Sequence, residues 1–470
     1  MTGTDIQAVA GRLSQAFESD GEYLTRVFDT PAGSRRSRVP GTGEDGEGHK
    51  HWWRQYWNGE VPEPDLRPGP QREIRTAEIF CGPGGLAQGV KQACLELGYK
   101  FSSKLAIDND SGAVDVYRRN HGTELPWKRS IVDLLDKDRV EGTGADAQFR
   151  YTPVITEREV LAVLQEPIDL LLAGPPCQGH SNLNNHTRRD DERNGLYLKV
   201  PTFAIAADIP MIIIENVTAV VHDAAGVVDT AKGLFENNGY YVTELKLRAD
   251  KLGWPQRRGR HFLVARHNRL GSPPLTEEEI TDALKIDPPE SVLWAIEDLE
   301  DEVGVCGMTR QPNSRTHTKD PAQIGTKERL EWFSGHPGVY DLPPEMHNRL
   351  HRPGEVREVP DANGEIHQQI VEGTTYTSVY GRMNPKEPAP TLTTGFLSPG
   401  RGRFIHPTQL RVLTPKEATR LQGFPDNYVW ELHSEERPTT SDLVKWIGDA
   451  VPMPLGHAAA LSVLAPGIPN

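Results

Sequence analysis

The feature that most constrains this chain is a short apolar segment, Ile168 to Ala173, that runs directly into Gly174-Pro175-Pro176-Cys177. A run of this length is typical of a buried strand. The two prolines can neither pair within a sheet nor continue a helix, so the strand must end just before the cysteine. Open α/β folds bind their ligands at the ends of such strands. The segment therefore predicts a central strand that presents Cys177 at a binding site.

A lone cysteine in this position is commonly just a small buried side chain, because free cysteine packs as a hydrophobe. Three other chemistries fail on the neighbouring residues. A zinc deaminase needs Pro-Cys-x-x-Cys, but the third residue after Cys177 is His180. The Gly-x-Ser-x-Gly pattern of a nucleophile elbow is not completed after Ser181, and a redox Cys-x-x-Cys pair is absent. A single thiol nucleophile remains the functional interpretation.

Composition bounds the class of protein. The 470 residues suffice for one large domain and a smaller one, and 44 glycines and 38 prolines indicate many loops. The four cysteines have no metal-ligand spacing, which predicts free thiols, a reducing compartment and no metal site. The N-terminus lacks a signal pattern, and no stretch approaches the roughly 18 apolar residues of a membrane span. We therefore expect a soluble, cytoplasmic protein.

The net charge of −14 argues against indiscriminate binding to polyanions. Two segments are nevertheless locally basic, Trp254 to Arg260 and Val379 to Arg411. Such runs are commonly solvated faces, yet one basic face is enough to hold nucleic acid.

The first 70 residues stand apart from the rest. Apolar residues at helical spacing predict a helix from Asp5 to Phe28. A linker follows, and then an aromatic and basic cluster from His51 to Trp57. We expect this cluster to pack against the main domain, with stacking on nucleic-acid bases as the alternative.

From Ile74 the pattern becomes strand, glycine-rich turn and helix, with the turn at Cys81 to Leu86. Glycines there let the backbone approach a ligand at the helix N-terminus. The next strand ends in Asp108, about twenty residues further on, as a ribose-binding carboxylate does. Together these features favour a nucleoside cofactor.

A second buried strand, Pro210 to Val217, contains Glu215 at its end. A carboxylate one strand away from a candidate nucleophile is an acid/base candidate, although it could equally cap a helix. The polar loop from Gly179 to Arg193 suggests a lid. Regular alternation is lost from residue 267 to about 378, which indicates a second, smaller domain or a large insertion.

Six motifs, in this order, resemble those of the cytosine-5 DNA methyltransferases, from about Thr76 to Leu464. They are Glu78 to Gly85, Pro175 to Gln178, Glu215 to Val217, Gln256 to Arg260, Arg411 to Tyr428 and Gly448 to Val451. The resemblance implies an α/β fold, a Rossmann-like mostly parallel sheet with helices on both faces, plus a smaller target-recognition domain. Together with the changes of sequence pattern described above, it predicts an N-terminal extension of unknown role (1–70), a catalytic domain (71–266), a target-recognition domain (267–378) and a returning C-terminal segment (379–470).

The resemblance implies S-adenosylmethionine as cofactor. The residues it assigns to cofactor binding are Phe80, Gly82, Gly84, Gly85, Leu86, Asp108, Asn109, Ile131, Gly174, Pro176, Leu196, Asp449 and Ala450. The chain differs from the family's usual residues at three positions, with Asp108 for Glu, Ser130 for Asp and Asp449 for Asn.

The family resemblance also implies the chemistry. Attack of the Cys177 thiolate on carbon 6 of cytosine makes carbon 5 nucleophilic, and Glu215 relieves charge on the ring. Arg258 and Arg260 complete the catalytic set. The base must leave the duplex to be reached. Residues implied to bind the substrate are Pro175, Gln178, Ser181 and Gln256.

The expected partner is double-stranded DNA. We expect a restriction-modification or other defence context, in which further subunits are possible partners. We expect the protein itself to be a monomer. An RNA (tRNA) methyltransferase shares every motif, although the large variable region favours DNA. A catalytically silent binding module would have lost Cys177 or Glu215, and both are present. A nicotinamide-dependent oxidoreductase lacks its full fingerprint here.

Overall fold

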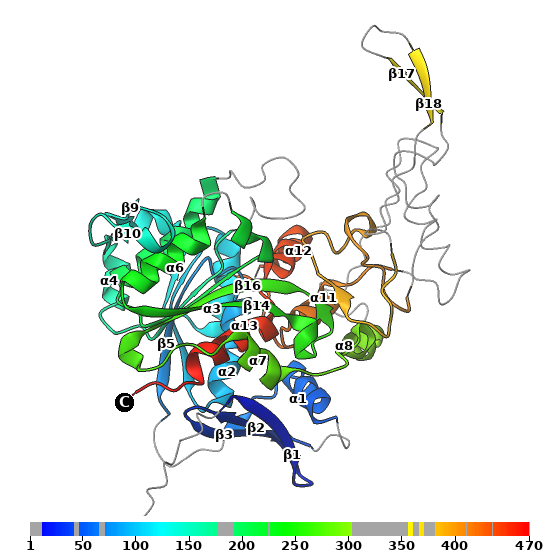
Figure 1. Ribbon diagram of the computed structural model, residues 1–470. Helices are drawn as coiled ribbons and strands as arrows, with labels where there is room; N and C mark the ends of the chain where they lie inside the picture. Colours follow the sequence, from blue (N-terminus) through cyan, green and yellow to red (C-terminus); the bar gives the residue numbers. More distant parts are fainter. Residues whose placement is uncertain are drawn as a thin grey trace, which may run out of the picture.

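The computed structural model describes residues 12–41, 47–64, 71–176, 192–223, 226–302, 356–360, 366–370, 381–409, 411–434 and 436–469. A seven-stranded sheet lies at its centre, in the order β14-β16-β13-β12-β5-β6-β7 (Figure 1). The strands are β5 (Glu73–Ile79), β6 (Lys100–Ile107), β7 (Leu125–Trp127), β12 (Leu170–Ala173), β13 (Met211–Asn216), β14 (Tyr240–Arg248) and β16 (Gly259–His267). Only β16 runs against its neighbours, so the prediction of a mostly parallel sheet is confirmed.

The two central strands explain why this sheet forms. Every residue of β12 and of β13 is buried, as expected for parallel strands covered on both faces. Their register pairs Leu170 with Met211 and Ala173 with Ile214. Since β5, β12 and β13 run in the same direction, their carboxyl ends meet at one edge of the sheet.

Helices cover both faces of the sheet. On one face lie α2 (Gly85–Glu96), α3 (Ser111–His121) and α13 (Met453–Leu464); on the other lie α4 (Arg158–Val163), α5 (Lys199–Ala206) and α6 (Val227–Asn237). Alternate residues of β12 join two separate hydrophobic cores, Leu170 and Leu172 in one and Leu171 and Ala173 in the other. The fold is therefore the three-layer α/β architecture that the sequence predicts.

Helix α13 is buried along its whole length and packs directly on α2. The helices approach so closely that a Cβ atom at Gly89 would lie 2.5 Å from the backbone of α13. The segment Thr440–Leu464 comprises α12 (Thr440–Asp449) and α13, and by length and composition alone it could span a membrane. This contradicts the expectation that no stretch comes close to such a span. The apolar window is 89% buried inside the protein, so we assign it to the core.

The predicted helix from Asp5 to Phe28 is wrong where the structure describes it. Residues from Ser14 onward form an antiparallel sheet of β1 (Ser14–Ser19), β2 (Tyr23–Thr30), β3 (Gly33–Pro40) and β4 (Glu63–Pro64). Turn chemistry decides the outcome, because the Asp20 carboxylate accepts hydrogen bonds from the backbone N–H groups of Glu22 and Tyr23. Apolar spacing alone does not register this turn.

Helix α1 (Gly48–Trp57) carries the aromatic cluster, and its Trp52, Tyr56 and Trp57 are buried. The Trp57 ring lies 5.4 Å from that of Trp254 and 4.9 Å from that of Trp294, measured between ring centroids. The cluster therefore packs against the main domain, as predicted, and these rings are not available to stack on bases.

The remaining elements are shorter. They are α7 (Glu277–Leu284), α8 (Val292–Ile296), α11 (Pro415–Gln422), β8 (Leu135–Asp136), β9 (Val140–Glu141), β10 (Gln148–Phe149), β11 (Val154–Ile155), β15 (Gln256–Arg257), β17 (Val356–Pro360), β18 (Ile366–Ile370) and β19 (Ala389–Pro390). Helix α7 packs on β14 and α13, and α8 packs on α11. Residues 277–296, which the sequence assigns to the target-recognition domain, thus pack on the central sheet and on the C-terminal segment; the domain boundaries stay a prediction.

A buried ionic network fastens the N-terminal sheet to the main domain. Glu96 of α2 accepts hydrogen bonds from Arg26 Nη1 at 2.8 Å and from Trp52 Nε1 at 3.2 Å. Its other oxygen lies 2.7 Å from His457 Nε2 of α13. Burial alone would raise the pKa of Glu96, but Arg26 and His457 outweigh that effect and lower the pKa to about 2.

We predict that Arg26→Met destabilises the protein by about 3–5 kcal/mol, since it leaves the Glu96 charge buried without its main partner. Chemical denaturation would measure the change. Arg36→Met is the matched control, because Arg36 pairs with Glu18 at the exposed surface of the same sheet and should change stability by less than about 1 kcal/mol. Equal effects of the two substitutions would contradict a special role for the network.

Candidate active site

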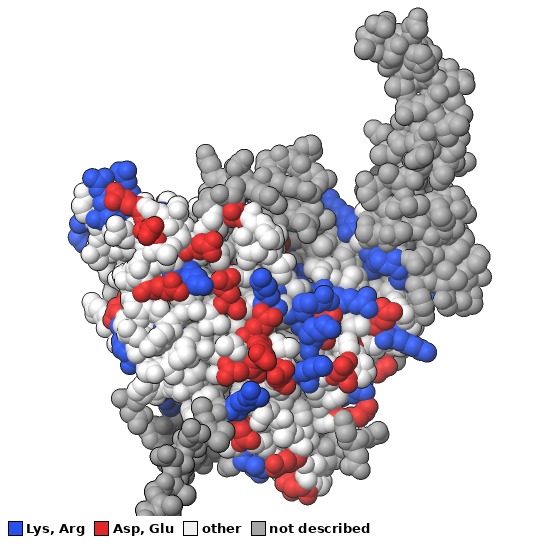
Figure 2. All heavy atoms as spheres, viewed as in Figure 1, with Lys and Arg blue, Asp and Glu red and all other residues white. Residues whose placement is uncertain are grey.

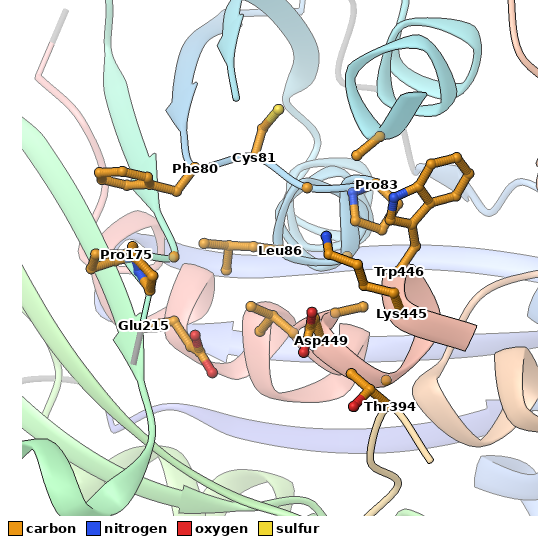
Figure 3. Close-up of a pocket in the computed structure, with 18 of the residues that line it drawn as sticks. Phe80, Cys81, Pro83, Leu86, Pro175, Glu215, Thr394, Lys445, Trp446 and Asp449 are labelled. Atoms are coloured by element: carbon orange, nitrogen blue, oxygen red, sulfur yellow. The ribbon is translucent and has the colours of Figure 1, made fainter. Parts of the chain in front are cut away.

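A cavity of about 1670 Å³ opens at the carboxyl edge of the sheet (Figure 3). The ends of β5, β6, β12 and β13 form one side of it, and the segment from α12 to Val451 forms the other. Predicted site residues that line the cavity are Phe80, Gly82, Gly85, Leu86, Asp108, Asn109, Ile131, Gly174, Pro175, Pro176, Leu196, Glu215, Arg258, Arg260, Asp449 and Ala450. The fold thus brings most of the predicted residues together.

Some predicted residues do not line this cavity. Gly84 has a φ of +97°, and a Cβ atom at this position would come within 2.5 Å of the His121 side chain. Gln256 is fully buried, and its side-chain amide donates to the carbonyl oxygen of Leu421 at 3.0 Å. Contacts of this kind favour a structural role for both. Cys177, Gln178 and Ser181 lie outside the described residues, as does most of the predicted lid.

The glycine-rich turn and Asp108 form one side of the cavity, which we call the cofactor side because the sequence predicts cofactor binding there. Asp108 Oδ2 accepts a hydrogen bond from Gly82 N, and Oδ1 accepts one from Asp110 N, both at 2.9 Å. Burial raises the pKa of Asp108, while these two N–H groups partly offset the effect. Each carboxylate oxygen keeps a lone pair that could accept from a ribose hydroxyl. Apolar side chains beside it, Phe80, Leu86, Ile107 and Ile131, offer walls for a flat ring. This donor set fits an adenosine-containing cofactor.

Two residues of α12 complete this side of the cavity and were missed by sequence reasoning. Lys445 Nζ lies 2.9 Å from Asp110 Oδ2, and Trp446 Nε1 donates to the same oxygen at 3.0 Å. Figure 3 shows both side chains beside Pro83. Lys445 and Asp449 are four residues apart on one helix, next to the glycine of the last motif, and that spacing was the available signal.

Glu215 lies on the opposite side, at the end of β13, and points into the cavity (Figure 3). Its Oε1 atom is 2.7 Å from Nε of Arg260, which comes from the adjacent strand β16. Burial raises the pKa of Glu215, and the cations of Arg260 and Arg258 only partly reverse that shift. The carboxyl group therefore keeps a proton to higher pH than an ordinary glutamate.

The end of β12 is tied to the same strand. Asn216 Nδ2 donates a hydrogen bond to the carbonyl oxygen of Pro175 at 3.3 Å. Gly174 has only distant neighbours, with Glu215 Oε2 at 3.8 Å from where its Cβ would be. The residues that lead into Cys177 thus lie directly beside Glu215.

Arg258 connects this side to the C-terminal segment. Its guanidinium donates to the carbonyl oxygens of Leu392 at 2.5 Å, Gly448 at 3.0 Å and Ala450 at 3.2 Å. The side chain is 2% exposed. Arg258 therefore holds the returning segment against β16, in addition to raising the positive potential near Glu215.

The two basic segments are not simple basic faces. Arg382 and Arg411 are buried, and Arg411 pairs with Glu417 at 2.6 Å. Arg257 is exposed but pairs with Glu387 at 2.5 Å. Figure 2 shows acidic and basic side chains interspersed over the visible face, with one group of Lys and Arg near its middle. Local grouping is thus compatible with the overall negative charge.

Comparison with known proteins decides the family. The profile of the family described as C-5 cytosine-specific DNA methylase matches residues 74–464. The chain belongs to this family. It is accordingly a DNA (cytosine-5-)-methyltransferase, and DNA is its substrate.

Relatives of this methyltransferase match most of its length. Type II methyltransferase M1.BsuMI of Bacillus subtilis (strain 168) is 32% identical over 464 residues, covering 97% of this chain and 96% of the relative. Type II methyltransferase M.AgeI of Thalassovita gelatinovora is 26% identical, covering 83% and 99%. A solved structure of a prophage-encoded E. coli protein, described as a DNA modification methyltransferase, has a TM-score of 0.51 at 21% identity, covers 82% of this chain and 97% of that one, and shows the same fold.

We predict that Arg258→Met destabilises this methyltransferase by about 3 kcal/mol or more, because three buried carbonyl oxygens lose their donors at about 1–3 kcal/mol each. Urea denaturation would measure it. The neighbouring variant Arg257→Met removes an exposed ion pair and should cost less than about 1 kcal/mol. A stability loss confined to Arg257→Met would contradict the role of Arg258 in holding the C-terminal segment against β16.

Proposed function

We propose that this methyltransferase moves a methyl group from S-adenosylmethionine to carbon 5 of cytosine in double-stranded DNA, through a covalent adduct between Cys177 and a flipped-out base. The observation that carries the proposal is the buried pair of Glu215 and Arg260, 2.7 Å apart, in the wall of the cavity. It lies one strand away from the end of β12, where Pro175 and Pro176 lead into Cys177.

Carbon 5 of cytosine is a poor nucleophile, so the chain must activate it. The Cys177 thiolate forms a bond from sulfur to carbon 6, which places electron density on carbon 5. After carbon 5 has gained the methyl group, a base removes its proton and the bond between sulfur and carbon 6 breaks. The proton leaves to water or to a base that the sequence does not identify.

Glu215 supports the attack on carbon 6. In its protonated form the carboxyl donates a hydrogen bond or a proton to ring nitrogen N3, which neutralises the charge that develops there. Its raised pKa keeps this form populated at higher pH than in an ordinary glutamate. Arg260 holds the carboxyl in position through its Nε atom.

Residues on the other side of the cavity would hold the cofactor. Asp108 is placed to accept from ribose hydroxyls, and Phe80, Leu86 and Ile131 to pack against the adenine and the methionine chain. When bound, S-adenosylmethionine supplies an electrophilic methyl group on a sulfonium. The cavity reaches both Asp108 and Glu215, so one continuous space could hold cofactor and base together.

The cytosine must flip out of the duplex, because the Cys177 side chain cannot reach carbon 6 of a stacked base. The relatives named Type II methyltransferases support a restriction-modification context. We accordingly place the enzyme in the cytoplasm with the DNA it modifies, and propose that it acts as a monomer.

Cys177→Ala should abolish transfer of labelled methyl groups to DNA, because no other step makes carbon 5 nucleophilic. Incubation with labelled S-adenosylmethionine and unmethylated DNA, followed by base-resolution mapping, would test this and reveal the recognised sequence. Cys306→Ala serves as the control for loss of a thiol and should retain transfer. Label in 5-methylcytosine from the Cys177→Ala protein would overturn the mechanism.

Glu215→Gln should slow methyl transfer by about 10²–10⁴-fold at neutral pH, the range typical of a lost general acid. The wild-type rate should fall as pH rises through the raised pKa of Glu215, since the protonated form is the active one. Glutamine does not titrate, so this alkaline decline should be missing from the variant. Parallel pH profiles of single-turnover rates would check it, and an unchanged decline in the variant would exclude Glu215 as its source.

A further inference from the structure

Glu78, the next-to-last residue of β5, is a buried carboxyl group in the wall of the cavity. Its side chain is 1% exposed, and its Oε2 atom has no hydrogen-bond partner among the residues that the structure describes. An unpartnered buried carboxyl oxygen is costly, so its retention beside a ligand cavity calls for a functional explanation.

The described residues that act on the Glu78 carboxyl come from several elements, and none of these residues is cationic. Asp108 from the end of β6 adds negative charge, and Tyr117 of α3 hydrogen-bonds to the Glu78 carboxyl. Cys81 and Tyr428 also lie in this cluster, as neutral thiol and phenol groups whose pKa values are raised by burial and further by Glu78. His121, next to Tyr117, is neutral, because burial lowers its pKa to about 3.

Lys445, a cation in the wall of the same cavity, is engaged elsewhere. On the opposite side of this part of the cavity, it pairs with Asp110 at 2.9 Å. Burial therefore dominates at Glu78, with the charge of Asp108 adding to it, and raises the pKa to about 8. At neutral pH the Glu78 carboxyl is mostly protonated.

We propose that Glu78 releases this proton to solvent when S-adenosylmethionine binds, so that cofactor binding is coupled to ionisation of a buried acid. The inference rests on the proposed cofactor. S-adenosylmethionine carries a sulfonium and an ammonium against one carboxylate, a net charge of +1, and this charge stabilises the Glu78 carboxylate. The O–H bond of the carboxyl breaks, the proton passes to buffer, and no other reactant is needed.

Coupling of this kind is reciprocal. If binding expels a proton, affinity must rise with pH, by up to about tenfold per unit, until Glu78 is already ionised in the free protein near pH 8. The demethylated product S-adenosylhomocysteine lacks the sulfonium charge. Glu78 therefore makes preference for S-adenosylmethionine over this product increase between about pH 6 and pH 8.

Isothermal titration calorimetry on the full chain tests the proposal. S-adenosylmethionine and S-adenosylhomocysteine are titrated at pH 7 in two buffers of different ionisation enthalpy, which gives the number of protons released. We expect a release approaching one proton per S-adenosylmethionine and a smaller one for S-adenosylhomocysteine. Glu78→Gln, an uncharged isostere, should bind both ligands and release fewer protons. Its affinity for S-adenosylmethionine should lack the rise of up to about tenfold per pH unit that we expect for the wild type.

A control variant keeps the outcomes distinct. Glu73→Gln removes an acid at the other end of the same strand, which pairs with Lys100 and does not line the cavity, and it should leave the Glu78-dependent release in place. If Glu78→Gln does not fold, wild-type protein that releases no proton at pH 7 still overturns the proposal. Equal release from wild type and Glu78→Gln, or loss only in Glu73→Gln, overturns it too. Failure of wild type to bind either ligand would instead refute the proposed cofactor.

Discussion

The close packing of α2 against α13 is the contact on which the site depends. The two helices come from opposite ends of the catalytic fold, and at Gly89 their backbones leave no room for a side chain. Helix α2 begins at the glycine-rich turn, and α13 begins two residues after Val451. Their packing therefore fixes two walls of the cavity relative to each other. The hydrogen bonds of Glu96 connect α2 to Arg26 of the N-terminal sheet and to His457 of α13. The N-terminal sheet is therefore joined to the same two helices.

Charge divides the cavity into two parts. Carboxyl groups gather on the cofactor side, where burial raises the pKa of both Glu78 and Asp108. Arginines gather near Glu215 on the other side. The contrast with Glu96 and Glu417 is informative, because those buried carboxylates have cationic partners and their pKa values fall to about 2. An acid-rich part suits a cofactor with net positive charge, and an arginine-rich part suits a base attached to phosphates.

The sequence predicts the sheet well because β12 and β13 are apolar throughout, and a run buried on both faces of a parallel sheet has that pattern. It predicts the cavity because carboxyl ends of parallel strands share an edge, so Asp108 and Glu215 had to lie there. It fails where distant contacts decide. The hairpin turn at Asp20 overrides helical spacing, and Lys445 reaches the site only through the return of the C-terminal segment. Likewise, nothing local shows that Gln256 is buried against Leu421.

The central claim is that Cys177 bonds to cytosine in the space between Glu215 and the cofactor side. The most direct test incubates the enzyme and S-adenosylmethionine with a DNA duplex that carries 5-fluorocytosine at the mapped target position. A base cannot remove the fluorine that replaces the proton at carbon 5, so the adduct persists after methyl transfer. Denaturing electrophoresis and peptide mass spectrometry would then locate the attachment. The account predicts a DNA adduct, stable to denaturation, on the peptide that contains Cys177. Methylation of the target without any such adduct, or an adduct on another cysteine, would contradict it.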